Sequence, residues 1–592
     1  MGVQQTMVTA ASIESMIVLD CGSTTTRAVL VDLVDGHYRF IARGETFNVS
    51  GDDEDALLSA VREVLHQIET VTGRAFLNDA GQLIEPERGG GEGVDALLVV
   101  ADFNPPLRVI LAGLSDHISL ASARRAIRAA HAQIAYVISP ESIGDATQTE
   151  ETRLSLISAL NPDAIILTGG VNGSPAEPVT NLATLITLGC SLVEETSNMR
   201  LLYAGNEAIR DEIVETVGDT IPLTILDNVR PSLDEENLES LSETLEVLYR
   251  DRMLAESTGL ATVARWSQCP ITTSSQALGY VIKYLARMYG QGHDVLGVDI
   301  GGATTTAAFV IDETFHLVNS PDMGISRGIS QVVALSGIER ITRWLPVEID
   351  ADTARDRLLN KELRSSSLPQ TLTDLYLEQA VAREALRLTL GQGQMLRQEQ
   401  DANAGLSEFE IIIGSGGVLA HAPQHAQAAL LLLDAIQPTG ITTLWLDTTS
   451  LAIPVGTLAT IHPVAATHVM EGDAFLNLGT AICPVGTGMP RPGDVVMRIT
   501  ITYSDDRTLD LEIPYGSLEV IPLPLGEKAS LEARPLKGFD VGAGPGAKRK
   551  IKRLVGGMMG LIIDARGRPL QFPTDPTERL ERVQRWYSGI GA

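Results

Sequence analysis

Two turns in the chain share a spacing of aspartate, glycine and threonine that is suited to holding phosphate. Each turn follows a short apolar run, at residues 16–19 in the first case and 295–298 in the second. The first turn contains Asp20, Gly22, Ser23, Thr24 and Thr25, and the second contains Asp299, Gly301, Gly302, Ala303, Thr304 and Thr305. Because Asp20, Gly22 and Thr25 match Asp299, Gly301 and Thr304 without a gap, the repeat is stronger evidence than either turn alone.

The residue types in these turns fit a phosphate and magnesium site. Glycine takes up positive φ and has no side chain, so several backbone N–H groups can converge on phosphate oxygens. A carboxylate would repel a bare phosphate, so Asp20 and Asp299 fit a Mg²⁺ ion that keeps some of its waters and stands between them and the phosphates. We therefore expect both aspartates to act in catalysis through the metal. The alternative is an ordinary hairpin in which glycine only reverses the chain.

A third glycine-rich turn follows a predicted buried strand that ends near residue 413. Its residues are Gly414, Ser415, Gly416 and Gly417. A Cβ in this turn would clash or would forbid the required φ, so we expect Gly416 and Gly417 to let the backbone pass close to an adenine or ribose. The three turns together predict one nucleotide site.

The order of strands and turns repeats along the chain, which predicts an α/β fold made of two related lobes. A strand enters a Gly-Gly turn at residues 162–170, and another strand lies at 221–227. The same order recurs at residues 408–417 and 441–447. We interpret this as a duplicated α/β unit in which the two copies carry insertions at different places.

With 592 residues the chain is too long for one core, and we divide it into four regions. We expect a first lobe at 16–231, a helical connection at 232–290, a second lobe at 291–483 with a helical insertion at 350–400, and a β-rich domain at 484–592. The helical regions show apolar residues at helical spacing. In the last region short alternating strands and frequent glycine and proline replace the helical pattern.

Charge and composition exclude several classes of function. A formal net charge of −30 argues against an extended surface for nucleic acid or for an anionic membrane. The four cysteines lie far apart and give neither a zinc site nor a disulfide framework, which fits a reducing cytoplasm. Polar residues at the start of the chain and interrupted apolar runs predict neither a signal peptide nor a membrane span.

The three turns resemble the motifs of the acetate kinase/sugar kinase/Hsp70/actin superfamily. Residues 20–25 look like its first phosphate motif, residues 299–304 like its second and residues 413–418 like its adenosine motif. The resemblance implies duplicated actin/Hsp70-like ATPase lobes that close over ATP and Mg²⁺, with both aspartates holding the metal through water. The sequence departs from the pattern at Ala303, where many members have threonine, and at Thr306, where some have aspartate.

Within that superfamily the whole chain is most similar to the glutamate mutase accessory family called MutL or GlmL, which is unrelated to the mismatch-repair MutL. The similarity continues into residues 555–569, beyond both lobes. It implies an ATP-binding and ATP-hydrolysing helper that remodels or reactivates an adenosylcobalamin-dependent mutase such as glutamate mutase.

Two other function classes share the same cleft. A small-molecule kinase or an ATP-dependent hydantoinase/oxoprolinase-like enzyme would show stoichiometric phosphorylation or substrate-dependent ADP release. A nucleotide-gated, actin-like scaffold would show ATP-dependent polymerisation. The sequence sets neither the identity of the partner nor the oligomeric state.

A basic run at residues 548–553 places five cations in six positions of this acidic chain. The simpler interpretation is a solvated strand or loop whose cations balance nearby acids. The alternative is a docking surface for an acidic partner such as the mutase, since a local positive patch raises the encounter rate and fixes orientation.

Overall fold

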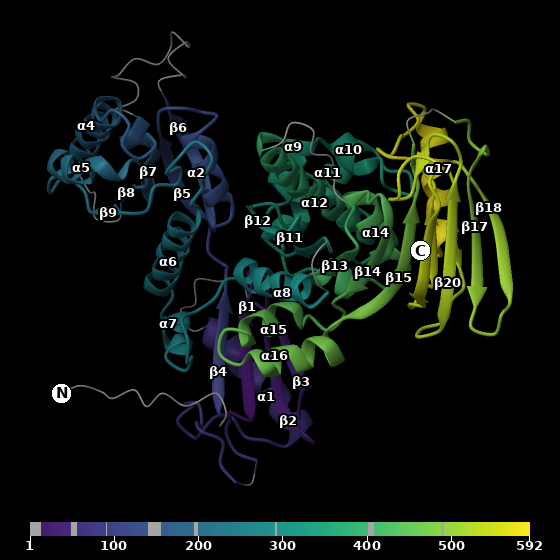
Figure 1. Ribbon diagram of the computed structural model, residues 1–592. Helices are drawn as coiled ribbons and strands as arrows, with labels where there is room; N and C mark the ends of the chain where they lie inside the picture. Colours follow the sequence, from purple (N-terminus) through teal and green to yellow (C-terminus); the bar gives the residue numbers. More distant parts are fainter. Residues whose placement is uncertain are drawn as a thin grey trace.

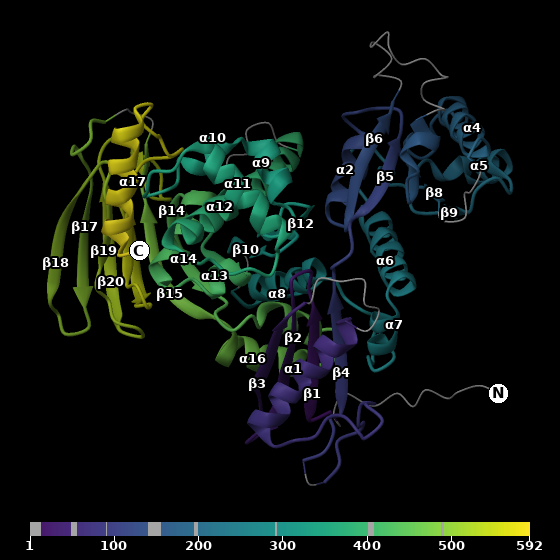
Figure 2. The same ribbon diagram turned by 180° about the vertical axis from the view of Figure 1, so that it is seen from behind.

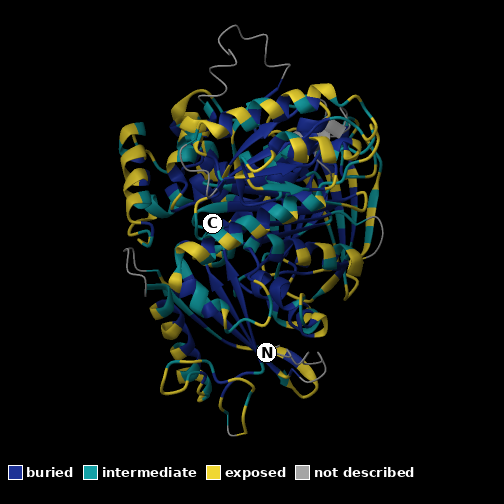
Figure 3. Cartoon of the chain, turned by 90° about the vertical axis from the view of Figure 1, so that its left-hand side faces the viewer, coloured by how far each residue is buried: buried dark blue, intermediate teal, exposed yellow. Residues whose placement is uncertain are grey.

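The computed structural model of this chain describes residues 13–48, 56–89, 91–139, 156–193, 199–289, 293–400, 408–486 and 490–592. These residues form two lobes, an inserted domain and a strand-rich C-terminal region (Figure 1). The strands lie mostly in the interior, and the exposed residues gather on the outer helices and loops (Figure 3). Among the described residues, no helix is both long and apolar enough to span a membrane.

The first lobe is built on a four-stranded sheet with the order β3-β2-β1-β4. Strand β1 is buried on both faces, because Ile17 and Leu19 pack into one apolar cluster with α1 while Met16 and Val18 pack into another with α8. It pairs antiparallel with β2 and parallel with β4. The elements are β1 (Ser15–Cys21), β2 (Thr25–Val34), β3 (His37–Phe47), α1 (Ala56–Thr72) and β4 (Ala96–Ala101).

The second lobe repeats this strand order in a longer sheet. Its order is β12-β11-β10-β13-β14-β15-β23-β19, so that β12-β11-β10-β13 corresponds to β3-β2-β1-β4. The α/β fold with two duplicated lobes that we expected is confirmed. The strands are β10 (Val295–Ile300), β11 (Thr304–Ile311), β12 (Thr314–Pro321), β13 (Ile411–Ser415), β14 (Gly440–Leu446), β15 (Leu476–Cys483), β19 (Leu518–Ile521) and β23 (Leu561–Asp564).

Helices cover the second sheet and include the predicted insertion. Residues 350–400 hold α11 and α12, and the division of the chain at these bounds stays a prediction. The helices of this lobe are α9 (Ile329–Ser336), α10 (Ile338–Thr342), α11 (Ala351–Leu363), α12 (Leu372–Gln400), α13 (Gly417–Ala420) and α14 (His425–Ile436).

Two helices pack between the sheets and connect the lobes. Helix α8 (Ser274–Tyr289) touches α15 (Ala452–Leu458), and a Cβ on Gly456 would lie 2.0 Å from the carbonyl oxygen of Ala277. Only glycine therefore allows this close approach. Helix α15 packs against β1 and α16 (Pro463–Val469) packs against β3, so the chain returns to the first lobe after β14.

Residues 107–139, 156–193 and 199–264 form a separate parallel sheet with helices on both faces, which we call the inserted domain (Figure 2). Its strand order is β6-β5-β7-β8-β9. The strands are β5 (Leu107–Ala112), β6 (Ala132–Ile138), β7 (Ala164–Leu167), β8 (Arg200–Tyr203) and β9 (Leu223–Ile225). The helices are α2 (Ser119–Arg128), α4 (Glu177–Ser191), α5 (Arg210–Val217), α6 (Glu239–Glu256) and α7 (Thr258–Ala264).

The inserted domain changes how the two copies correspond. The strand expected at residues 162–170 is present as β7, but it pairs with β5 and β8 and not with the sheet of the first lobe. Its expected counterpart β13 pairs directly with β10. The match between residues 162–170 and 408–417 is therefore wrong. A strand followed by a glycine turn is a pattern common to parallel α/β sheets, so it does not show to which sheet residues 162–170 belong. The domain boundaries remain a proposal.

The C-terminal region is rich in strands but does not stand apart from the second lobe. Strands β19 and β23 extend the sheet of that lobe, and α17 packs against β19. A second, antiparallel sheet has the order β18-β17-β20-β22. The remaining elements are β16 (Val485–Gly486), β17 (Val495–Tyr503), β18 (Thr508–Pro514), β20 (Lys528–Pro535), β21 (Phe539–Asp540), β22 (Arg549–Val555) and α17 (Pro576–Ile590).

Candidate nucleotide site between the lobes

The two Asp-Gly turns have the same backbone geometry. The N–H of Gly22 donates to the carbonyl oxygen of Thr25 over 3.0 Å, and the N–H of Gly301 donates to that of Thr304 over 2.9 Å. Each turn closes the hairpin at one end of its lobe's central strand pair, β1 with β2 and β10 with β11. The equivalence inferred from the sequence is therefore present in three dimensions.

The two turns touch one another. A Cβ on Gly302 would lie 2.2 Å from Thr24 Oγ1 and 2.9 Å from Ser23 Oγ, so a larger residue at position 302 would push the turns apart. Among the residues that the structure describes, the buried hydroxyl of Thr24 has no hydrogen-bond partner. An unpaired buried hydroxyl is costly, and a phosphate oxygen would satisfy it.

Both turns open onto one cavity of about 910 Å³ between the lobes. The expected site residues that line it are Asp20, Gly22, Ser23, Thr24, Thr25, Asp299, Gly301, Gly302, Ala303, Thr304, Ser415, Gly416 and Gly417. Two expected residues do not line it. Thr305 is buried and donates to the carbonyl oxygen of Met323, and Gly414 packs against Leu419 and Leu432.

The third turn has two glycines with different roles. Gly416 has a φ of +101°, and a Cβ there would lie 2.2 Å from the carbonyl oxygen of Ile300. Gly417 has neither constraint, since a Cβ there would meet nothing within 4 Å. The clash expected for both glycines therefore holds for Gly416, whereas a side chain at Gly417 would have open space before it.

A family model described as MutL protein matches residues 16–474. The chain belongs to the MutL protein family. The resemblance to the glutamate mutase accessory family is thereby confirmed over residues 16–474, which end before strands β15, β19 and β23 of the second lobe. A search of curated proteins found no match.

Several solved structures overlap weakly with this MutL family chain. Nucleotide-free acetone carboxylase is 12% identical with a TM-score of 0.29, covering 85% of this chain and 81% of that one. The activator of 2-hydroxyisocaproyl-CoA dehydratase from Clostridium difficile, with bound ADPNP, is 7% identical with a TM-score of 0.29, covering 76% and 96%. Xylulose kinase from Bifidobacterium adolescentis is 10% identical with a TM-score of 0.25, covering 78% and 94%. Structural similarity this low assigns no property to the chain beyond its membership of the family.

In this MutL family chain the two turn aspartates have different surroundings. Asp20 lies 3.5 Å from Arg27 Nη1, and Arg27 also bonds Glu45 over 2.8 Å. Burial raises the pKa of Asp20, and Arg27 opposes that rise. Burial raises the pKa of Asp299 to about 6, while a hydrogen bond with the hydroxyl of Ser415 opposes the rise. A nearby divalent cation would favour the charged form of both carboxylates.

Asp102 is a site residue that the sequence reasoning missed. It lines the cavity directly after β4, and desolvation raises its pKa to about 7, with Asp20 adding to the rise. The side chain of Ser274, at the start of α8, is hydrogen-bonded to it. The apolar run at residues 96–101 that precedes it indicates a buried strand, but only the parallel pairing of that strand with β1 brings Asp102 beside Asp20.

The helical insertion supplies a further wall of the cavity that no motif had indicated. Lys361 of α11 and Glu378 of α12 line the cavity and form an ion pair of 3.1 Å. The connecting residues 367–372 also line it, and Leu368 and Leu372 are exposed there. This wall could not be predicted from a local motif, because its position depends on how α11 and α12 pack on the second sheet.

The residues present fit a nucleotide with a divalent cation. The Thr24 hydroxyl, which has no partner among the described residues, can bond a phosphate oxygen, and the absence of a side chain at Gly302 lets the two turns meet beside it. Within the described part of the chain, no three His, Cys, Asp or Glu side chains are grouped so that they could hold a metal by themselves. A Mg²⁺ ion here would take most of its ligands from water and phosphate, as it usually does.

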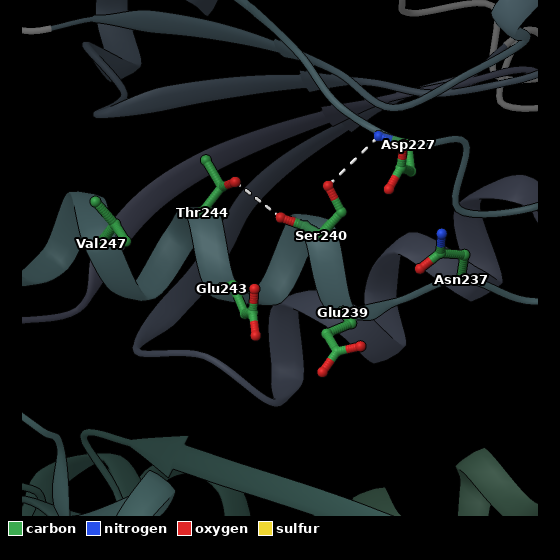
Figure 4. Close-up of a pocket in the computed structure, with 7 residues that line it drawn as sticks. All are labelled: Asp227, Asn237, Glu239, Ser240, Glu243, Thr244 and Val247. Carbon is green, nitrogen blue, oxygen red and sulfur yellow. Dashed lines mark hydrogen bonds between the residues drawn. The ribbon is translucent and has the colours of Figure 1, made fainter. Parts of the chain in front are cut away.

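A second hollow, of about 510 Å³, lies on the inserted domain (Figure 4). It is lined by Asp227, Asn237, Glu239, Ser240, Glu243, Thr244 and Val247. No expected site residue lies in it, and its carboxylates give it the character of a solvated acidic face.

The basic run at residues 548–553 is largely paired with acids. Lys548 and Lys550 lie 2.5 and 2.9 Å from carboxylate oxygens of Glu532, and Arg549 lies 3.3 Å from Glu408. These pairs favour the simpler of the two interpretations, in which the cations balance nearby acids.

Proposed function

We propose that this protein binds Mg²⁺ and ATP between its lobes, hydrolyses the ATP, and uses that cycle as an accessory or reactivating factor for an adenosylcobalamin-dependent mutase such as glutamate mutase. The observation that carries the proposal is the meeting of the two equivalent Asp-Gly turns at one cavity, with the unpaired Thr24 hydroxyl between them. Membership of the MutL family supports the mutase as partner. The acidic charge and scattered cysteines support a cytoplasmic protein without nucleic-acid or membrane partners.

The residues of the cavity divide into holding and reacting groups. The backbone N–H groups of both turns and the hydroxyls of Ser23 and Thr24 hold phosphate oxygens. Asp20 and Asp299 would hold a Mg²⁺ ion through water, and the ion would supply charge neutralisation for the phosphates. Residues at and after Gly416 contact the adenosine.

Asp102 is the group that we assign to orienting the attacking water. Within the described part of the chain no cation forms an ion pair with Asp102, whereas Asp20 is paired with Arg27. Its pKa of about 7 suits a group that accepts a proton near neutral pH. Water then adds to the terminal phosphorus, the bond to the ADP oxygen breaks, and the released proton passes to the carboxylate, giving ADP and inorganic phosphate.

Phosphate release by the purified protein tests this function. We expect Asp20→Asn and Asp299→Asn each to reduce hydrolysis on the order of 10²-fold while the protein stays folded, since each removes a charge that acts in the transition state. Full activity in both variants would reassign the aspartates to structural roles. Addition of a cobalamin mutase inactivated in turnover should lead to ATP-dependent recovery of mutase activity, and no recovery would remove the partner assignment.

A further inference from the structure

A buried network of hydrogen bonds runs from the second phosphate turn to the inserted domain. Thr306 Oγ1 donates to Asn319 Oδ1 over 3.0 Å, and Asn319 Nδ2 lies 2.9 Å from His131 Nδ1. The three residues come from β11, β12 and the loop before β6, and each is at most 3% exposed. Desolvation lowers the pKa of His131 to about 3, so its ring is neutral and Nδ1 can accept the amide hydrogen.

His131 is held firmly within the inserted domain. Its ring stacks on Tyr249 of α6 with centroids 4.5 Å apart, and its backbone N–H donates to Glu246 over 2.8 Å. Glu246 in turn accepts from Thr273. A movement of α6 therefore carries the imidazole with it.

The inserted domain is attached to the two lobes by different kinds of contact. Its core is continuous with that of the first lobe, because Leu245 and Tyr249 of α6 belong to the same apolar cluster as Ile17 and Leu19 of β1. Against the second lobe, α2 lies beside β12 in Figures 1 and 2, and Asn319 on that strand reaches His131. Apolar packing fixes the domain to the first lobe without a preferred direction, whereas the bond between Asn319 and His131 is directional and therefore sensitive to rotation of the second lobe.

The Thr306 end of this hydrogen-bond network lies at the nucleotide site. Thr306 lines the cavity and faces Asp299 across the β10–β11 ladder. The bond between Asn319 and His131 is formed in the same arrangement in which the two phosphate turns touch. A ligand that bridges both turns favours that arrangement and with it the bond.

We propose that the hydrogen bond between Asn319 and His131 is a latch through which nucleotide at the phosphate turns fixes the inserted domain to the second lobe. The proposal rests on the proposed function, since it names how occupancy of that same site is passed on. It makes the inserted domain the part of the molecule whose position reports the nucleotide state.

Amide hydrogen exchange on the full chain tests the latch. In the wild-type protein, saturating Mg²⁺ and ATP should slow exchange in residues 119–138 and 314–321 by about fivefold or more, the lower range of measured couplings between sites. His131→Phe keeps the stack on Tyr249 but removes the acceptor, and Asn319→Leu removes the donor. Each of these two variants should abolish the ATP-dependent slowing of exchange. Because coupling between two sites is reciprocal, each variant should also weaken ATP binding, measured by calorimetry, by a factor similar to the lost slowing. His117→Phe, at an exposed position before α2, is the matched control and should behave as the wild type.

The nucleotide-free proteins test the bond itself. Each single variant should speed exchange in both segments, and the double variant should add nothing, because the two side chains make one interaction. Additive effects, or ATP-dependent slowing that survives in a folded single variant, would overturn the latch. A wild-type protein that binds ATP without any change in exchange would overturn it as well. A wild-type protein that binds no ATP overturns the proposed function instead, and the nucleotide-free comparison then still decides whether the bond couples the two parts.

Discussion

At the scale of single residues, the cavity holds three aspartates in three environments. Asp20 has Arg27 at 3.5 Å, Asp299 has the hydroxyl of Ser415, and Asp102 has that of Ser274. The first two were predictable because each lies in a local motif. Asp102 was not, because its position depends on the pairing of β4 with β1 across a long stretch of sequence.

Asp102→Asn should reduce ATP hydrolysis on the order of 10²-fold, the lower range for loss of a positioned acid–base group. ATP affinity should stay close to that of the wild type, because the phosphates are held by the turns. Single-turnover hydrolysis and calorimetry measure the two quantities separately. Hydrolysis at the wild-type rate would move the base elsewhere in the cavity.

Glu246 should make stability depend on pH. Burial raises its pKa to about 7, from 4.5 in the unfolded chain. Between these values the folded protein keeps a proton that the unfolded chain has released, so the contribution is full below 4.5 and is lost as pH rises through about 7.

Glu246→Gln stays uncharged, so its melting temperature should fall less than that of the wild type as pH rises across this window. Because only Glu246 is changed, the comparison separates its effect on the pH dependence of stability from that of Asp102, whose pKa is also about 7. Thermal melts without nucleotide measure the two slopes. Parallel slopes would mean that Glu246 is ionised in the folded protein throughout.

At the scale of elements, the turns were predictable and the sheets that carry them were only partly so. The Asp-Gly and Gly-Gly patterns indicate backbone conformations that depend on a few adjacent residues. The sequence does not specify that β7 pairs with β5 and not with β4, because both neighbours are apolar parallel strands. The sequence pattern likewise predicted that β19 and β23 belong to a separate C-terminal domain, yet these strands extend the sheet of the second lobe.

The third turn gives a matched pair of variants. Gly417→Val should leave the fold intact and weaken ATP binding, because its side chain enters the open cavity next to the ligand. Gly416→Ala should disturb the turn itself, since its Cβ meets the carbonyl of Ile300 and its φ is +101°. Thermal melts and calorimetry separate the two effects. If Gly417→Val binds ATP as the wild type does, the adenosine lies elsewhere.

At the scale of the whole molecule, a buried charge network ties the C-terminal region to the second lobe. Asp434 of α14 accepts from Arg383 of α12 over 2.8 Å and from Arg566, which follows β23, over 2.7 Å. Arg566 also pairs with Asp564, and the two arginine side chains are fully buried. Helix α12, which borders the nucleotide cavity, is therefore bonded through α14 to the C-terminal strands.

Asp434→Asn should destabilise this unit by about 3–5 kcal/mol, because it leaves the buried guanidinium group of Arg383 without its compensating charge. The control is Glu512→Gln, which breaks the exposed pair with Arg498 and should cost less than about 1 kcal/mol. Denaturant unfolding of both variants measures the difference. Equal and small effects would show that Asp434 contributes no more than a surface pair.

The account as a whole requires that the two phosphate turns and the third turn hold one nucleotide between the lobes. The most direct measurement is titration calorimetry of the purified full chain with ATP, with and without Mg²⁺, alongside the folded Gly417→Val variant. We predict one site per chain, tighter binding with Mg²⁺, and weaker binding by the variant. A folded wild-type protein that binds no ATP at millimolar concentration with Mg²⁺ present would contradict the account.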